Sequence, residues 1–109
     1  MTLYGISAVK IDERCGEVAA VKLHGITPGL PNSGTVTVDE GRVVDYRDVA
    51  KLIVAGDEIR VLVSDGPESL KPTADHVRKK PTGQFEYIES CDADRKSTQA
   101  LLELPPFNS

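Results

Sequence analysis

Short runs in which apolar and polar residues alternate recur along this chain, and they constrain its fold more than any other feature. Alternation with a period of two places successive side chains on opposite faces of a strand, so one face of each run can be buried. We predict strands at residues 4–11, 17–26, 35–38, 58–64, 75–79 and 84–89. Turn-forming residues predict loops at 27–34, 39–41 and 65–73, and the first two and last two runs are predicted to form hairpins.

Two segments carry the pattern of a helix. Asp45 is suited to cap a helix, because its carboxylate can accept a hydrogen bond from a backbone N–H of the first turn. Apolar residues then repeat at intervals of three and four as far as Gly56, a residue type that commonly ends helices. Asp94 is predicted to cap a second, short helix that runs to Glu103 and stops before Pro105.

These elements predict an α+β fold. The expected sheet is small, largely antiparallel, built of five or six strands and free to curl or to become barrel-like, with one central helix and a short C-terminal helix. The chain has 109 residues and no linker or internal repeat, so we expect a single domain over residues 1–109. Aromatic residues make up only 5% and Trp is absent, which predicts an aliphatic core.

The charge balance disfavours polyanionic partners. The formal net charge is -4 at pH 7, which repels nucleic acid and anionic lipid at long range. No apolar stretch approaches the ~18 residues that a membrane span requires, and no secretory signal precedes the first strand. We therefore expect a cytoplasmic protein that does not associate with membranes.

No metal or cofactor is predicted. Asp92, Asp94 and Glu103 match three positions of a calcium-binding EF-hand loop, but Lys96 and Ser97 occupy positions that require an oxygen ligand and a glycine. The acidic residues are instead interpreted as the favoured charge at a helix N-terminus.

Cysteine and histidine are scattered singly, without the paired spacing of zinc sites. Cys15 and Cys91 are expected to be reduced thiols, with a disulfide between them as the alternative. His24 and His76 are expected on solvated strand faces, because each lies beside polar or basic neighbours.

Sequence motifs of nucleophilic catalysis, phosphate loops and dinucleotide binding are absent. We therefore predict that the protein is not an enzyme and has no catalytic residues. The remaining enzymatic alternative is a site that comes together only in three dimensions, from residues distant in sequence.

Two surfaces are candidates for binding. Arg78, Lys79 and Lys80 lie on or beside the predicted hairpin, where basic residues either block edge-to-edge pairing or contact a phosphate or a nucleic-acid backbone. Leucine and phenylalanine gather near the C-terminal end of the chain and must dock somewhere. Either they pack on the protein's own sheet or they form an exposed patch that binds a partner. The candidate patch consists of Leu101, Leu104 and Phe107.

Four short motifs together resemble a family of small bacterial domains of unknown function. They are the opening Ile6-x-Ala8-Val9, the helix end Ala55-Gly56-Asp57, the strand Glu86-Tyr87-Ile88 and the closing Thr98-x-x-Leu101-x-x-Leu104-Pro105. The resemblance covers most of the chain, although residues 98–101 replace the Asp-Asn-Leu of the family's closing segment. It implies a bacterial cytoplasmic origin and assigns no functional residue.

Our leading hypothesis is a non-enzymatic protein-binding or regulatory module of a bacterial cytoplasm. It follows from the missing catalytic motifs and from the apolar residues near the C-terminal end. The alternative is a small domain that binds nucleic acid or a phosphate ligand through the basic hairpin at residues 76–80.

Overall fold

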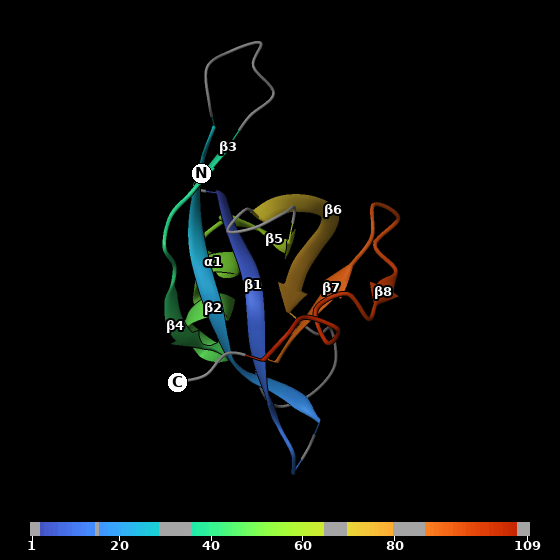
Figure 1. The fold of residues 1–109 in the computed structure, drawn as a ribbon. Coiled ribbons are helices and arrows are strands. Elements are labelled where there is room, and N and C mark those ends of the chain that lie inside the picture. The colour runs from blue at the N-terminus through green and yellow to red at the C-terminus, as the bar shows by residue number, and fades with distance from the viewer. Residues whose placement is uncertain (1–2, 15, 29–35, 65–69, 80–86, 107–109) are drawn as a thin grey trace.

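The computed structural model of the protein describes residues 3–14, 16–28, 36–64, 70–79 and 87–106. Strands dominate this part of the chain (Figure 1). In chain order the elements are β1 Leu3–Asp12, β2 Glu17–Pro28, β3 Val36–Val38, β4 Arg42–Asp45, α1 Tyr46–Val54, β5 Glu58–Ser64, β6 Leu70–Lys79, β7 Ile88–Cys91 and β8 Ser97–Thr98.

The strands form one mixed sheet in the order β3-β2-β1-β5-β6-β7-β8, and β4 shares the outer edge of β2 with β3. β1 and β5 are parallel, whereas the other pairs are antiparallel. Parallel neighbours cannot be joined by a hairpin, so the chain crosses over between them through β2, β3, β4 and α1. In Figure 1, α1 lies behind β1 and β2 and covers one face of the sheet.

The helix seals an aliphatic core. Asp45 caps α1 as predicted, since its Oδ1 accepts the Asp48 N–H at 3.0 Å. Val49 and Ala50, on the inner face of α1, are fully buried. The buried cluster consists of Ile6, Val9, Val18, Val21, Leu23, Val49, Ile59, Val61, Val77, Ile88 and Leu101. No aromatic ring belongs to this cluster among the described residues, as the composition predicts.

The α+β class, the first hairpin and the central helix are confirmed, but the sheet is larger and more open than predicted. It has eight strands in the described residues instead of five or six. Within those residues β8 pairs with β7 alone, so the sheet does not close into a barrel-like form. Helix α1 has nine residues, and no helix in the described ranges has the length and apolar character to cross a bilayer.

Strands β4 and β6 extend into segments that were not predicted to be strands. Residues 42–45 were left unassigned, yet they pair with β2. β6 begins at Leu70, inside the segment 65–73 that was predicted to be a loop because it contains turn-forming residues such as Pro72. The pairing of β5 with β6 shifts between Arg60↔His76 and Leu62↔Pro72, so β6 bulges there. A bulge tolerates proline, because the missing N–H interrupts no regular ladder. Of the predicted strand 84–89, residues 84–86 lie outside the described residues.

The predicted helix over residues 94–103 is wrong. Asp92 Oδ1 accepts the N–H groups of Asp94 at 2.9 Å and of Lys96 at 3.0 Å, and Arg95 adopts a φ of 63°. A side chain that binds nearby backbone N–H groups in this way competes with helix formation. The chain therefore makes a tight turn and adds β8 to the sheet.

Ser90 fastens the segment that follows this turn. Its side chain is fully buried, and its Oγ donates to the Thr98 carbonyl at 3.0 Å. The same oxygen accepts from Thr98 Oγ1 at 2.8 Å and from the Leu101 N–H at 3.0 Å. These bonds hold Leu101 in the core, where it is 1% exposed.

We expect Ser90→Ala to lower the free energy of unfolding by about 1–3 kcal/mol, because a buried N–H and a hydroxyl would lose their acceptor. Urea denaturation followed by circular dichroism measures this loss. Ser97→Ala is the matched control, since Ser97 is exposed and should change stability by about 0.5 kcal/mol or less. Equal losses in the two variants would contradict this role of Ser90.

Candidate functional site

A gap in the pairing along the outer edge of β2 organises a cluster of polar groups. β3 pairs with β2 as far as Ile26, β4 resumes the pairing at Leu23, and residues 39–41 bridge the space between them. Within this bridge, Asp39 Oδ1 accepts the Gly41 N–H at 2.8 Å. We refer to residues 39–41 as the β3–β4 bridge.

His24 lies beneath the β3–β4 bridge and is only 4% exposed. Its Nδ1 is 2.8 Å from the carbonyl oxygen of Asp39, and its Nε2 is 2.6 Å from Ser7 Oγ. A carbonyl oxygen can only accept, so in the neutral ring Nδ1 carries the proton. Nε2 is then the acceptor for the Ser7 hydroxyl. The Asp39 carboxylate is also near, with Oδ1 4.0 Å from Nδ1.

Two backbone features make this contact possible. Gly41 has a φ of +79°, and a Cβ at this position would lie 2.6 Å from the His24 ring. Only glycine therefore fits over the imidazole without strain. Ser7 lies at the irregularity in β1 where the partners change from Ile6↔Leu23 to Ala8↔Lys22. A bulge of this kind redirects a side chain.

Sequence reasoning missed this cluster. The prediction that His24 lies on a solvated face is wrong, because the β3–β4 bridge covers it. Ser7 and Asp39 are 17 and 15 residues away from His24 and belong to no motif, so spacing could not join them. His76 is half-buried, with Nδ1 3.4 Å from Glu58 Oε1.

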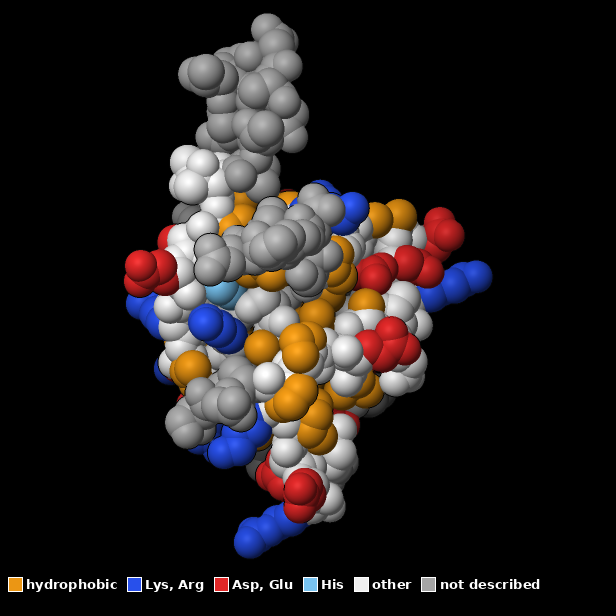
Figure 2. All heavy atoms as spheres, viewed as in Figure 1, with side chains coloured by type: hydrophobic (Ala, Val, Ile, Leu, Met, Phe, Trp, Pro, Cys, Tyr) orange, Lys and Arg blue, Asp and Glu red, His pale blue; other side chains and the backbone are white. Residues whose placement is uncertain are grey.

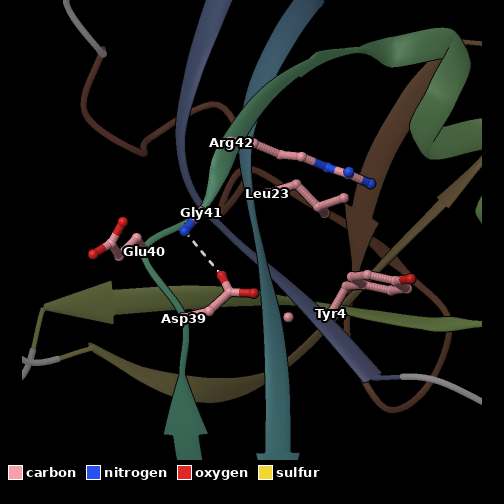
Figure 3. Close-up of a pocket in the computed structure, with 7 residues that line it drawn as sticks. Tyr4, Leu23, Asp39, Glu40, Gly41 and Arg42 are labelled. Carbon is pink, nitrogen blue, oxygen red and sulfur yellow. Dashed lines mark hydrogen bonds between the residues drawn. The ribbon is translucent and has the colours of Figure 1, made fainter.

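The β3–β4 bridge also forms one wall of a cleft of about 560 Å³. The lining residues are Tyr4, Leu23, Gly25, Asp39, Glu40, Gly41 and Arg42. Figure 3 shows Arg42 and Tyr4 extending into this space with Leu23 between them, whereas Glu40 points away. None of the ion pairs found within the described ranges involves Arg42.

A second hollow of about 420 Å³ continues the cleft between β4 and α1. It is lined by Leu23, Arg42, Val44, Asp48, Lys51 and Leu52. Because Leu23 and Arg42 line both hollows, we treat them as one site and call it the β4 groove. In the part of the chain that the structure describes, β4 pairs only with β2, so its other edge is unpaired.

Arg47, on the neighbouring helix, packs its guanidinium against an aromatic ring. Its guanidinium carbon lies 5.7 Å from the centroid of the Tyr46 ring, which stacks at 5.0 Å on Tyr87. A hydrogen bond with Tyr46 is the main cause that raises the pKa of Arg47 above its ordinary value. Arg42, in contrast, lines the cleft and takes part in no ion pair among the described residues.

The predicted basic cluster does not form one patch in the described residues. Arg78 Nε lies 2.9 Å from Glu89 Oε2, and its Nη2 donates to Ser97 Oγ at 3.3 Å. Lys79 follows Arg78 in β6, so the two side chains point to opposite faces of the sheet. Lys80 lies outside the described residues. On the face shown in Figure 2, acidic and basic side chains are interspersed around its margins.

The predicted partner patch packs on the protein's own sheet where it is described. Leu101 belongs to the core, and Leu104 is partly buried against it. Phe107 lies outside the described residues. Leu101 could meet a partner only if this segment left the sheet.

Of the two cysteines, Cys91 is in the predicted reduced state. Cys91 is a free thiol and is buried, with 6% of its surface exposed. A free Cys91 is not in the alternative disulfide with Cys15, which itself lies outside the described residues.

We expect Ser7→Ala to lower the free energy of unfolding by about 1–3 kcal/mol, because the buried Nε2 of His24 would lose its partner. The same change in a His24→Phe background should cost about 0.5 kcal/mol or less, since no ring nitrogen remains to be satisfied. Urea denaturation of the four proteins in this cycle measures the coupling. Additive losses would contradict the hydrogen bond.

Comparisons of this chain with protein-family models, with curated proteins and with solved structures find no match. The resemblance to small bacterial domains of unknown function therefore stays a prediction.

Proposed function

We propose that the protein is a protein-binding module that holds an extended segment of its partner in the β4 groove. The observation that carries this proposal is the outer edge of β4, which pairs with no strand in the described residues and borders the cleft that Arg42 lines; no ion pair among those residues involves Arg42. The resemblance to small bacterial domains and the free thiol of Cys91 support a bacterial cytoplasmic setting.

Strand addition suits this edge. An unpaired strand offers a row of backbone N–H and C=O groups, and an extended peptide satisfies them as it adds to the sheet. Val43, on β4, is 54% exposed, so an apolar side chain of the partner could contact it. Alternate side chains of the added strand would then face the groove.

The lining of the groove favours a particular peptide chemistry. Leu23 and Leu52 supply apolar surface for an aliphatic side chain. Arg42 and Lys51 lie in the same groove as Asp39 and Asp48, so the lining carries both signs of charge. An acidic residue of the partner would pair with Arg42, because a guanidinium can bind a carboxylate in bidentate fashion. The segment that fits is therefore extended, with an apolar residue close to an acidic one.

The other predicted functions have less support. A nucleic-acid or phosphate ligand would need the basic residues together, yet Arg78 is neutralised by Glu89 and Lys79 points to the other face. A patch at the C-terminal end would need Leu101 to leave the core. Neither has an observation that favours it over the β4 groove.

Peptides that bind the intact protein can be selected from a random phage-displayed library. We expect their affinity for the Arg42→Glu variant to be about tenfold lower, a loss of about 1.4 kcal/mol, because the guanidinium that binds the peptide carboxylate is gone. Lys71→Glu makes the same charge change at an exposed position on β6 and should leave affinity unchanged. Isothermal titration measures both affinities. Amide chemical shifts should change along residues 42–45 when the peptide binds. Shifts confined to other strands, or a library that yields no binder, would exclude this function.

A further inference from the structure

A second activity follows from the contact between Ser7 and His24. Because His24 Nδ1 donates to the Asp39 carbonyl, the lone pair of Nε2 is free to accept the hydroxyl proton of Ser7, 2.6 Å away. A histidine held in this tautomer is the arrangement that activates serine nucleophiles. We propose that Ser7 is a nucleophile activated by His24 and that it accepts acyl groups from small esters.

The burial of the two residues suits these roles. The side chain of His24 is only 5% exposed, so water does not compete for its nitrogen atoms. Ser7 is intermediate in exposure, and it lies at the bulge of β1, where its hydroxyl meets His24 Nε2. The base is thus enclosed, whereas the residue that carries the nucleophile is partly exposed.

Two groups of Asp39 hold the Nδ1 side of the His24 ring. The Asp39 carbonyl accepts the Nδ1–H at 2.8 Å. Asp39 Oδ1 lies 4.0 Å from the same nitrogen. Because that carboxylate is 63% exposed and screened by water, the carbonyl contributes more to holding the ring.

The proposed reaction is an acyl transfer. The Ser7 hydroxyl proton passes to His24 Nε2 as Oγ bonds to the ester carbonyl carbon, and the alcohol leaves with the proton from His24. Water then attacks the acyl group on Ser7 and gives a proton to His24. The carboxylic acid departs, and Ser7 Oγ takes the proton back. No oxidant, metal or cofactor is required by this sequence.

This activity is separate from peptide binding in the β4 groove, and it departs from the expectation of a protein without catalytic residues. The same two hydrogen bonds would satisfy a buried imidazole whether or not Ser7 reacts. Chemical reactivity is therefore the property that distinguishes a nucleophile from a structural contact.

The experiment treats the intact chain with diisopropyl fluorophosphate and locates the adduct by peptide mass spectrometry. Ser97 is the internal reference, because it is exposed and its Oγ donates to Glu89 Oε2 at 3.2 Å, with no histidine. We expect Ser7 to react on the order of 100-fold faster than Ser97, the lower range for a positioned general base. p-Nitrophenyl acetate should give a burst of one equivalent of nitrophenol, and Ser7→Ala should abolish it.

His24→Gln, checked for folding by circular dichroism, should reduce the modification of Ser7 to the rate of Ser97. If this variant does not fold, the comparison of Ser7 with Ser97 in the unmodified chain decides alone. Modification of Ser7 no faster than Ser97, or equally fast in folded His24→Gln, would overturn the proposal and leave the β4 groove unaffected.

Discussion

A buried imidazole needs a partner for each of its nitrogen atoms, and the outer edge of this sheet is arranged around that requirement. Ser7 reaches one nitrogen of His24 because β1 is irregular at that residue. The Asp39 carbonyl reaches the other because β2 loses its pairing between β3 and β4. The same arrangement fixes the β3–β4 bridge, which then walls the cleft that contains Arg42.

The two proposed functions share this bridge and use opposite sides of it. His24 lies beneath it, where Gly41 leaves room for the ring. On the other side, Asp39 and Gly41 line the cleft. Binding in the groove requires the bridge to keep its shape, whereas reaction at Ser7 requires only that the Asp39 carbonyl holds the tautomer of His24.

Local patterns in the sequence predicted the elements that depend on local physics. The Asp45 cap and the alternation in β1, β2 and β5 were read correctly, because a cap and a two-residue period need no distant partner. The helix at 94–103 failed because Asp92 binds the backbone N–H groups that follow it. The burial of His24 and its contact with Ser7 depend on strand pairing, which no local pattern encodes.

The parallel pairing of β1 with β5 also has a consequence for how the chain reaches this structure. It pairs the start of the chain with its middle, so the segment between them, which contains β2, β3, β4 and α1, forms a long loop that must close before β5 can pair with β1. Closing so long a loop costs chain entropy before any contact repays it. We infer that the β1–β2 hairpin forms early, and that docking of β5 beside β1 sets the folding rate.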